Sequence, residues 1–118
     1  MRVLVVEDET LVLFTLEAEL TRAGFEVVMA SDPAGARARL DEEGAELSGL
    51  VVDLNLSAEE TGFDVSRHAR AINPAIAVIY ISGNNPSRWE DQGVKDSVFL
   101  AKPVLSSEVA KALQARIG

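Results

Sequence analysis

The feature that most constrains the fold is a regular alternation of short apolar runs with longer segments of helical pattern. Strands are expected at residues 2–6, 26–30, 50–53, 77–81 and 98–101. Each run is nearly continuous in hydrophobicity, which is typical of parallel strands buried on both faces of a sheet. The helical segments between the runs then cover those two faces. The sequence therefore predicts an α/β fold with three layers.

Local capping signals predict where the helices begin and end. Helices are expected at residues 10–23, from 33 to near 44, at 63–72 and 85–92, and from 106 to the last residue. Gly24 is a typical C-terminal cap, and Asp32 followed by Pro33 is a typical helix start. Asn73 precedes a proline and is therefore expected to stop the third helix. Ser106 is expected to cap the last helix.

The fourth helical segment differs from the others. Residues 84–93 leave room for only a short helix and lack the repeated apolar positions of an amphipathic one. We therefore expect this helix to be short or irregular.

Composition excludes proteins that depend on a disulfide framework, a thiolate metal site or a cysteine nucleophile, because the chain has no cysteine. The chain has 118 residues, a formal net charge of -8 and no cysteine. This length suits one domain, so residues 1–118 are expected to form it without an effector domain. The most apolar stretch, residues 75–81, is too short to span a membrane, and no signal peptide is visible. We expect a cytoplasmic protein whose acidic charge argues against binding to nucleic acid.

Polar residues follow four of the five expected strands. Glu7 and Asp8 follow the first strand, and Asp53 ends the third. Ser82 follows the fourth strand, and Lys102 follows the fifth. Ligands of open α/β sheets bind beyond the carboxyl ends of the strands, and a strand order of 2-1-3-4-5 makes these groups neighbours. Any one of them alone fits a solvated turn or a helix cap, but the whole set favours a functional site.

The chemistry of this set is typical of phosphoryl transfer. Three close carboxylates repel one another unless a cation compensates, and together with Lys102 they carry a formal charge of about -2, which one Mg²⁺ neutralises. A phosphoryl group placed there meets a metal ion, an ammonium and a hydroxyl. Asp53 is the expected nucleophile, because a carboxylate can form an acyl phosphate.

Four motifs together resemble the receiver domain of two-component response regulators, in particular the stand-alone, chemotaxis-regulator-like members. They are Val3-Leu-Val-Val-Glu-Asp-Glu9, Val51-Val-Asp-Leu-Asn55, Ile81-Ser-Gly83 and Ala101-Lys-Pro103. The resemblance covers essentially the whole chain and implies a flavodoxin-like (βα)₅ fold. It also implies a signalling switch rather than an enzyme. On this resemblance, a histidine kinase or histidine phosphotransfer protein is expected to phosphorylate it, and it is then expected to change its contacts with an unknown downstream protein.

The resemblance implies a role for each residue of the site. Asp53 is the phosphoacceptor, and self-dephosphorylation is expected. Mg²⁺ is held by Glu7, Asp8, Asp53 and the backbone carbonyl of Asn55. Ser82 bonds a phosphoryl oxygen, Lys102 pairs with the phosphoryl group, and the Lys102–Pro103 peptide is cis. Phe99 is the aromatic switch residue, which turns inward when Ser82 moves toward the phosphoryl group.

The chain departs from the family pattern in three places. The first acid is Glu7, where aspartate is common, and Ser57 stands where many members have proline. The loop of residues 57–62 is about one residue longer than usual. Because residues 84–93 form a poor helix, an output surface built on the fourth helix is in doubt for this chain.

Two further questions stay open at the level of sequence. The same fold could serve as a phosphorylation-independent interaction module, whereas a phosphatase is disfavoured because Asn55 replaces the second acid that such enzymes need. The first helix carries five apolar residues that cannot all face the sheet. They are Leu11, Val12, Leu13, Phe14 and Leu16. Either some of them form an exposed docking patch, or all are buried between the sheet and the last helix.

Overall fold

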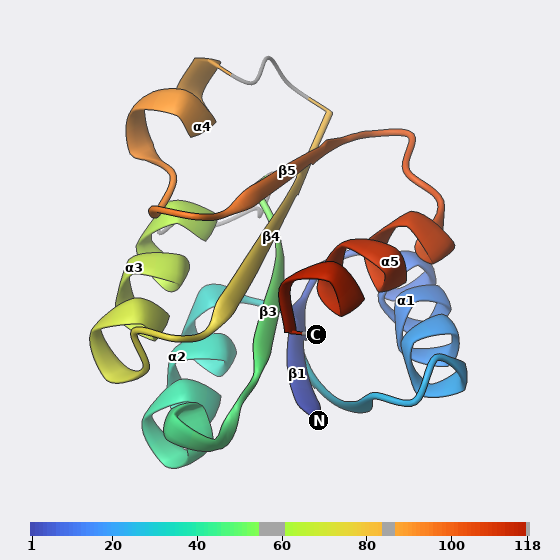
Figure 1. Ribbon diagram of the computed structural model, residues 1–118, viewed down its shortest axis with the longest axis horizontal. Coiled ribbons are helices and arrows are strands. Elements are labelled where there is room, and N and C mark those ends of the chain that lie inside the picture. Colours follow the sequence, from blue (N-terminus) through green and yellow to red (C-terminus); the bar gives the residue numbers. More distant parts are fainter. Residues whose placement is uncertain (55–60, 84–86, 118) are drawn as a thin grey trace.

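A five-stranded parallel sheet runs through the centre of the molecule (Figure 1). The structure is a computed structural model and describes residues 1–54, 61–83 and 87–117. The strands are β1 (Arg2–Val6), β2 (Glu26–Ala30), β3 (Gly49–Asp53), β4 (Ala77–Ser82) and β5 (Val98–Ala101). Their order is β2-β1-β3-β4-β5, which confirms the predicted order and places β5 at an edge.

Helices cover both faces of this sheet. They are α1 (Thr10–Arg22), α2 (Pro33–Glu43), α3 (Gly62–Ile72), α4 (Ser87–Gln92) and α5 (Ser106–Ile117), with a short 3₁₀ turn at Gly44–Glu46. In Figure 1, α1 and α5 lie against one face, and α2 and α3 lie against the other. The three-layer (βα)₅ architecture is therefore confirmed. Within the residues described, no helix has both the length and the apolar character needed to cross a bilayer.

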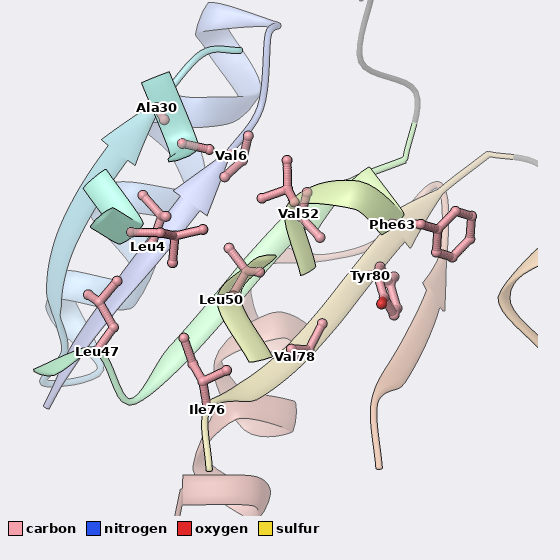
Figure 2. Close-up of a cluster of buried hydrophobic side chains, with 14 residues drawn as sticks. Leu4, Val6, Ala30, Leu47, Leu50, Val52, Phe63, Ile76, Val78 and Tyr80 are labelled. Carbon is pink, nitrogen blue, oxygen red and sulfur yellow. The ribbon is translucent and has the colours of Figure 1, made fainter. Parts of the chain in front are cut away.

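Two hydrophobic cores result because successive strand residues point to opposite faces. On β1, Val3 and Val5 pack in the core beneath α1 and α5. Leu4 and Val6 pack in the other core, beneath α2 and α3, which Figure 2 shows. Since all four side chains are buried, β1 is fixed from both sides and its carboxyl end has a defined position.

The helix ends largely follow their local signals. Gly24 has a φ of 100°, a conformation that a residue with a β-carbon rarely adopts, and it follows the end of α1. The Asp32 side chain accepts a hydrogen bond from the Gly35 backbone N–H at 2.6 Å, as expected for an N-cap. Ser106 is the first residue of α5 rather than the residue before it, so its predicted place as the cap was wrong by one position.

The start of α3 holds a capping box that the sequence analysis did not identify. The Thr61 hydroxyl accepts a hydrogen bond from the Asp64 backbone N–H at 3.3 Å, and the Asp64 carboxylate accepts one from the Thr61 backbone N–H at 2.9 Å. This reciprocal pair satisfies two backbone donors at the start of α3 and fixes where the helix begins.

The fourth helix is short, as predicted, with 6 residues. Asn85 and Pro86, with which the predicted helix of residues 85–92 begins, lie outside the described residues. Arginines of α3 hold the end of α4 and the segment after it: Arg67 donates to the carbonyl of Gln92, the last residue of α4, at 3.1 Å, and Arg70 donates to the Lys95 carbonyl at 2.6 Å. These hydrogen bonds from α3 thus help to hold α4, which lacks the apolar face of an amphipathic helix.

Candidate functional site

The predicted site residues lie at the carboxyl end of the sheet. Strand pairing places Val6 beside Val52 and Asp53 beside Ile81, so the residues that follow β1, β3 and β4 meet at one edge. Ser82 pairs with Ala101, the residue before Lys102. The strand order therefore brings the acids, the hydroxyl and the ammonium to one region, as the sequence predicted.

Three carboxylates converge at this edge. Glu7, Asp8 and Asp53 each offer an oxygen, and these atoms lie within 4.8 Å of one another. Glu7 and Asp53 are each only 2% exposed, whereas Asp8 is exposed to solvent. The cluster thus combines two buried acids with one that faces solvent.

One oxygen of Glu7 shows that this cluster suits a cation. The Glu9 backbone N–H donates to Glu7 Oε1 at 3.0 Å. The other oxygen, Oε2, is buried and has no hydrogen-bond partner among the described residues. Leaving a buried carboxylate oxygen unpaired is costly, and a divalent cation satisfies it. The residues present therefore fit the Mg²⁺ site implied by the sequence.

The electrostatics of Glu7 agree with this interpretation. Burial, followed by the nearby Asp53 carboxyl, raises the pKa of Glu7 to about 8. The carboxyl of Glu7 is therefore held largely protonated at neutral pH without a cation, and a bound cation favours its ionised form.

Lys102 binds Asp53 directly. Its Nζ lies 2.6 Å from Asp53 Oδ2. Partial burial on its own lowers the pKa of Lys102, but the hydrogen bond to Asp53 and the charges of Asp53 and Glu7 outweigh it and raise the pKa. Lys102 thus stays an ammonium ion beside Asp53. The Lys102–Pro103 peptide bond is cis, as the resemblance implied.

Ser82 and Phe99 lie on the two strands nearest Lys102. Ser82 is buried at the end of β4, and its carbonyl accepts a hydrogen bond from the Lys102 backbone N–H at 2.8 Å. Phe99 is half-buried on β5, and its ring packs against the indole of Trp89 on α4. Asn55, the predicted carbonyl ligand, lies outside the described residues.

An apolar surface adjoins the site. Leu11 and Phe14 of α1 are 76% and 53% exposed, whereas Leu13 and Leu16 are buried. A cavity of about 560 Å³ opens beside Leu11 and is also lined by Lys102. The question left open by the sequence is therefore resolved in favour of an exposed patch on α1.

Two residues near the site were not assigned a role from the sequence. Glu9 supplies the backbone N–H that orients Glu7 and also lines the cavity. Trp89 packs on Phe99, and its only sequence signal is an isolated aromatic residue in an otherwise polar helix. A backbone contact and a ring contact between distant elements have no periodic signature.

Comparison with known proteins gives a consistent family. The family model described as "Response regulator receiver domain" matches residues 3–114. The transcriptional regulatory protein QseB of Haemophilus influenzae is 29% identical over 99% of this chain. The aligned region is 52% of QseB, so the chain spans about half the length of this curated relative.

Solved structures show the same fold. A response regulator receiver protein from Sinorhizobium medicae WSM419 is 35% identical with a TM-score of 0.93, and the match covers 99% of this chain and 94% of that one. A Burkholderia pseudomallei response regulator protein, solved with a phosphorylated aspartic acid, calcium ion and citrate, is 28% identical. Its TM-score is 0.80, and the match covers 98% of this chain and 68% of that one.

Proposed function

The chain belongs to the response regulator receiver domain family, and we propose that Asp53 accepts a phosphoryl group from a phosphohistidine of a partner protein. The partner is a histidine kinase or a histidine phosphotransfer protein. The observation that carries this proposal is the buried Asp53 carboxylate held by Lys102 at 2.6 Å beside two further acids. Phosphorylation then changes the contacts of this domain with a downstream protein.

The proposed transfer is balanced within the two proteins. A carboxylate oxygen of Asp53 attacks the phosphorus, a P–O bond forms, and the P–N bond to the donor imidazole breaks. The electron pair stays on the imidazole nitrogen. The Lys102 ammonium, which now pairs with the Asp53 carboxylate, is placed to pair with the phosphoryl oxygens.

Mg²⁺ has a defined place in the proposal. Glu7, Asp8 and Asp53 would hold it, together with the backbone carbonyl of Asn55. When bound, the ion supplies positive charge that neutralises the acids and the phosphoryl oxygens. The Burkholderia pseudomallei structure, with its phosphorylated aspartate and calcium ion, supports this combination on the same fold.

The exposed apolar patch on α1 supports docking of the phosphodonor. Leu11 and Phe14 lie on the helix that directly follows Glu7 and Asp8. A partner seated there brings its histidine toward the carboxyl end of the sheet. The net charge of -8 favours protein partners over nucleic acid.

Intact mass spectrometry tests the proposal. The wild type is incubated with phosphoramidate and Mg²⁺ and is expected to gain the mass of one phosphoryl group. Asp53→Asn should gain none, whereas the matched control Asp41→Asn, at an exposed position on α2, should behave as wild type. Uptake by Asp53→Asn equal to that of wild type contradicts the proposal. If the affinity for a partner is changed neither by Asp53→Asn nor by removal of Mg²⁺, the result favours the phosphorylation-independent module instead.

A further inference from the structure

Trp89 is the only tryptophan of the chain and the only apolar residue of α4. Its ring centroid lies 5.7 Å from that of Phe99, with 32° between the ring planes. Its indole Nε1–H donates to Ser97 Oγ at 2.9 Å. The indole is thus held by one tilted ring contact with β5 and by one hydrogen bond to the loop before β5.

Gly93, Ser97 and Phe99 surround this indole, and we call these three contacts the Trp89 seat. A β-carbon on Gly93 would lie 2.5 Å from Trp89 Cδ1 and 2.6 Å from the Trp89 carbonyl oxygen. Glycine is therefore needed at this position for the ring to stay where it is. The seat also has a fixed base, because Ser97 Oγ donates to the Val94 carbonyl at 2.6 Å.

Hydrogen bonds connect Val94, which holds Ser97 in the Trp89 seat, to the hydrophobic core. The Val94 backbone N–H donates to the Tyr80 hydroxyl at 3.0 Å, and that hydroxyl also bonds Ser66 Oγ at 2.6 Å. Tyr80 and Ser66 are fully buried. One side of the Trp89 seat is therefore rigid, whereas its other side, Phe99, lies on the edge strand β5.

That edge strand leads directly to the site. β5 ends at Ala101, the next residue is Lys102, and Lys102 binds both the Asp53 carboxylate and the Ser82 carbonyl. A phosphoryl group on Asp53 adds negative charge and oxygen acceptors, which attract the Lys102 ammonium. Any resulting shift of β5 changes the contact between the Phe99 ring and Trp89.

We infer that Trp89 is a latch, whose ring contact with Phe99 and hydrogen bond to Ser97 hold α4 in its unphosphorylated position and loosen when Asp53 is phosphorylated. This inference rests on the proposed function. The coupling is reciprocal, so a latch that phosphorylation weakens must also oppose phosphorylation. An aromatic pair of this kind shifts such a balance by about 2- to 10-fold.

Trp89 fluorescence reports the latch without any substitution. Acrylamide quenching is measured with Mg²⁺ alone and with Mg²⁺ plus phosphoramidate, and intact mass is measured on the same samples. Phosphorylated protein is expected to show stronger quenching. Phosphorylated protein with unchanged quenching overturns the latch and leaves the proposed function standing. Protein that gains no phosphoryl mass contradicts the proposed function, and the latch fails with it.

Two variants probe the latch from the other side. Trp89→Leu is expected to raise the fraction of molecules in which α4 is already released, and with it the rate of phosphorylation by phosphoramidate, by about 2- to 10-fold. Trp89→Phe, which keeps a ring, should raise this rate by less. Ser97→Ala should raise Trp89 quenching before phosphorylation, whereas the matched control Ser107→Ala, exposed on α5, should not. A Trp89→Leu rate equal to or below that of wild type overturns the inference.

Discussion

At the scale of single residues, the site is organised around buried acids whose charges need compensation. Lys102 compensates Asp53 directly, but Glu7 keeps a buried oxygen without a hydrogen-bond partner among the described residues. Burial, followed by the neighbouring Asp53 carboxyl, is why the pKa of Glu7 rises. The binding site is therefore destabilising in the absence of a cation.

This imbalance predicts an unusual pH dependence for the metal-free protein. In the folded chain Glu7 stays protonated up to a pKa of about 8, whereas in the unfolded chain it ionises near its usual 4.5. Between these values folding takes up a proton, so the contribution of Glu7 to the free energy of unfolding falls as the pH rises. Urea unfolding of metal-free protein across this range should show that loss in wild type and a flatter profile in Glu7→Gln. Glu42→Gln, exposed on α2, is the control, and a Glu7→Gln profile parallel to that of wild type contradicts the prediction.

Addition of Mg²⁺ should reverse the effect. Because the ion binds the ionised acids, it should raise the urea midpoint of wild type, and by more at pH values near 8 than near 5. Asp53→Asn and Glu7→Gln should respond less than wild type, since each removes one carboxylate of the cluster. An equal response of all three proteins to Mg²⁺ places the ion elsewhere.

At the scale of elements, the sequence predicted what local chemistry determines. Asp32 and Pro33 favour a helix start through their own side chains, and Gly24 favours a helix end through its backbone freedom. The start of α2 and the end of α1 could therefore be predicted from the sequence. The convergence of Glu7, Asp53 and Lys102 was predicted from the polar residues at the strand ends together with the strand order 2-1-3-4-5. The seat of Trp89 could not be predicted, because its contacts join α4 to β5 and depend on packing between distant elements.

The capping box of α3 gives a prediction at this scale. Thr61→Ala removes the acceptor for the Asp64 backbone N–H and should lower the free energy of unfolding by about 1 kcal/mol. Thr15→Ala, an exposed threonine within α1, should change it little and serves as the control. Urea unfolding at neutral pH measures both, and equal midpoints for the two variants contradict the assigned cap.

At the scale of the whole molecule, α1 separates two tasks on its two faces. Leu16 is buried in the core that α1 shares with α5, and Leu11 is exposed beside the cavity next to Lys102. The same helix therefore stabilises the fold with one face and offers the other to a partner.

Because the two faces of α1 differ, replacing leucine by alanine should affect stability on the buried face and partner docking on the exposed face. Leu16→Ala should lower the free energy of unfolding by about 2–5 kcal/mol, whereas Leu11→Ala should change it by about 0.5 kcal/mol or less. Leu11→Ala should instead slow transfer from a phosphohistidine protein that phosphorylates the wild type, by about 5- to 10-fold, and should affect phosphoramidate far less. Equal slowing with both donors would mean that Leu11 acts on the chemistry and not on docking.

The central claim is that the phosphoryl group resides on Asp53, and chemical mapping tests it most directly. Borohydride reduces an aspartyl phosphate to homoserine, which tandem mass spectrometry locates in the sequence. Wild type treated with phosphoramidate and Mg²⁺ should carry homoserine at position 53, and protein without the donor should carry none. Homoserine at another aspartate, or a phosphorylated protein with an unmodified Asp53, would contradict the account.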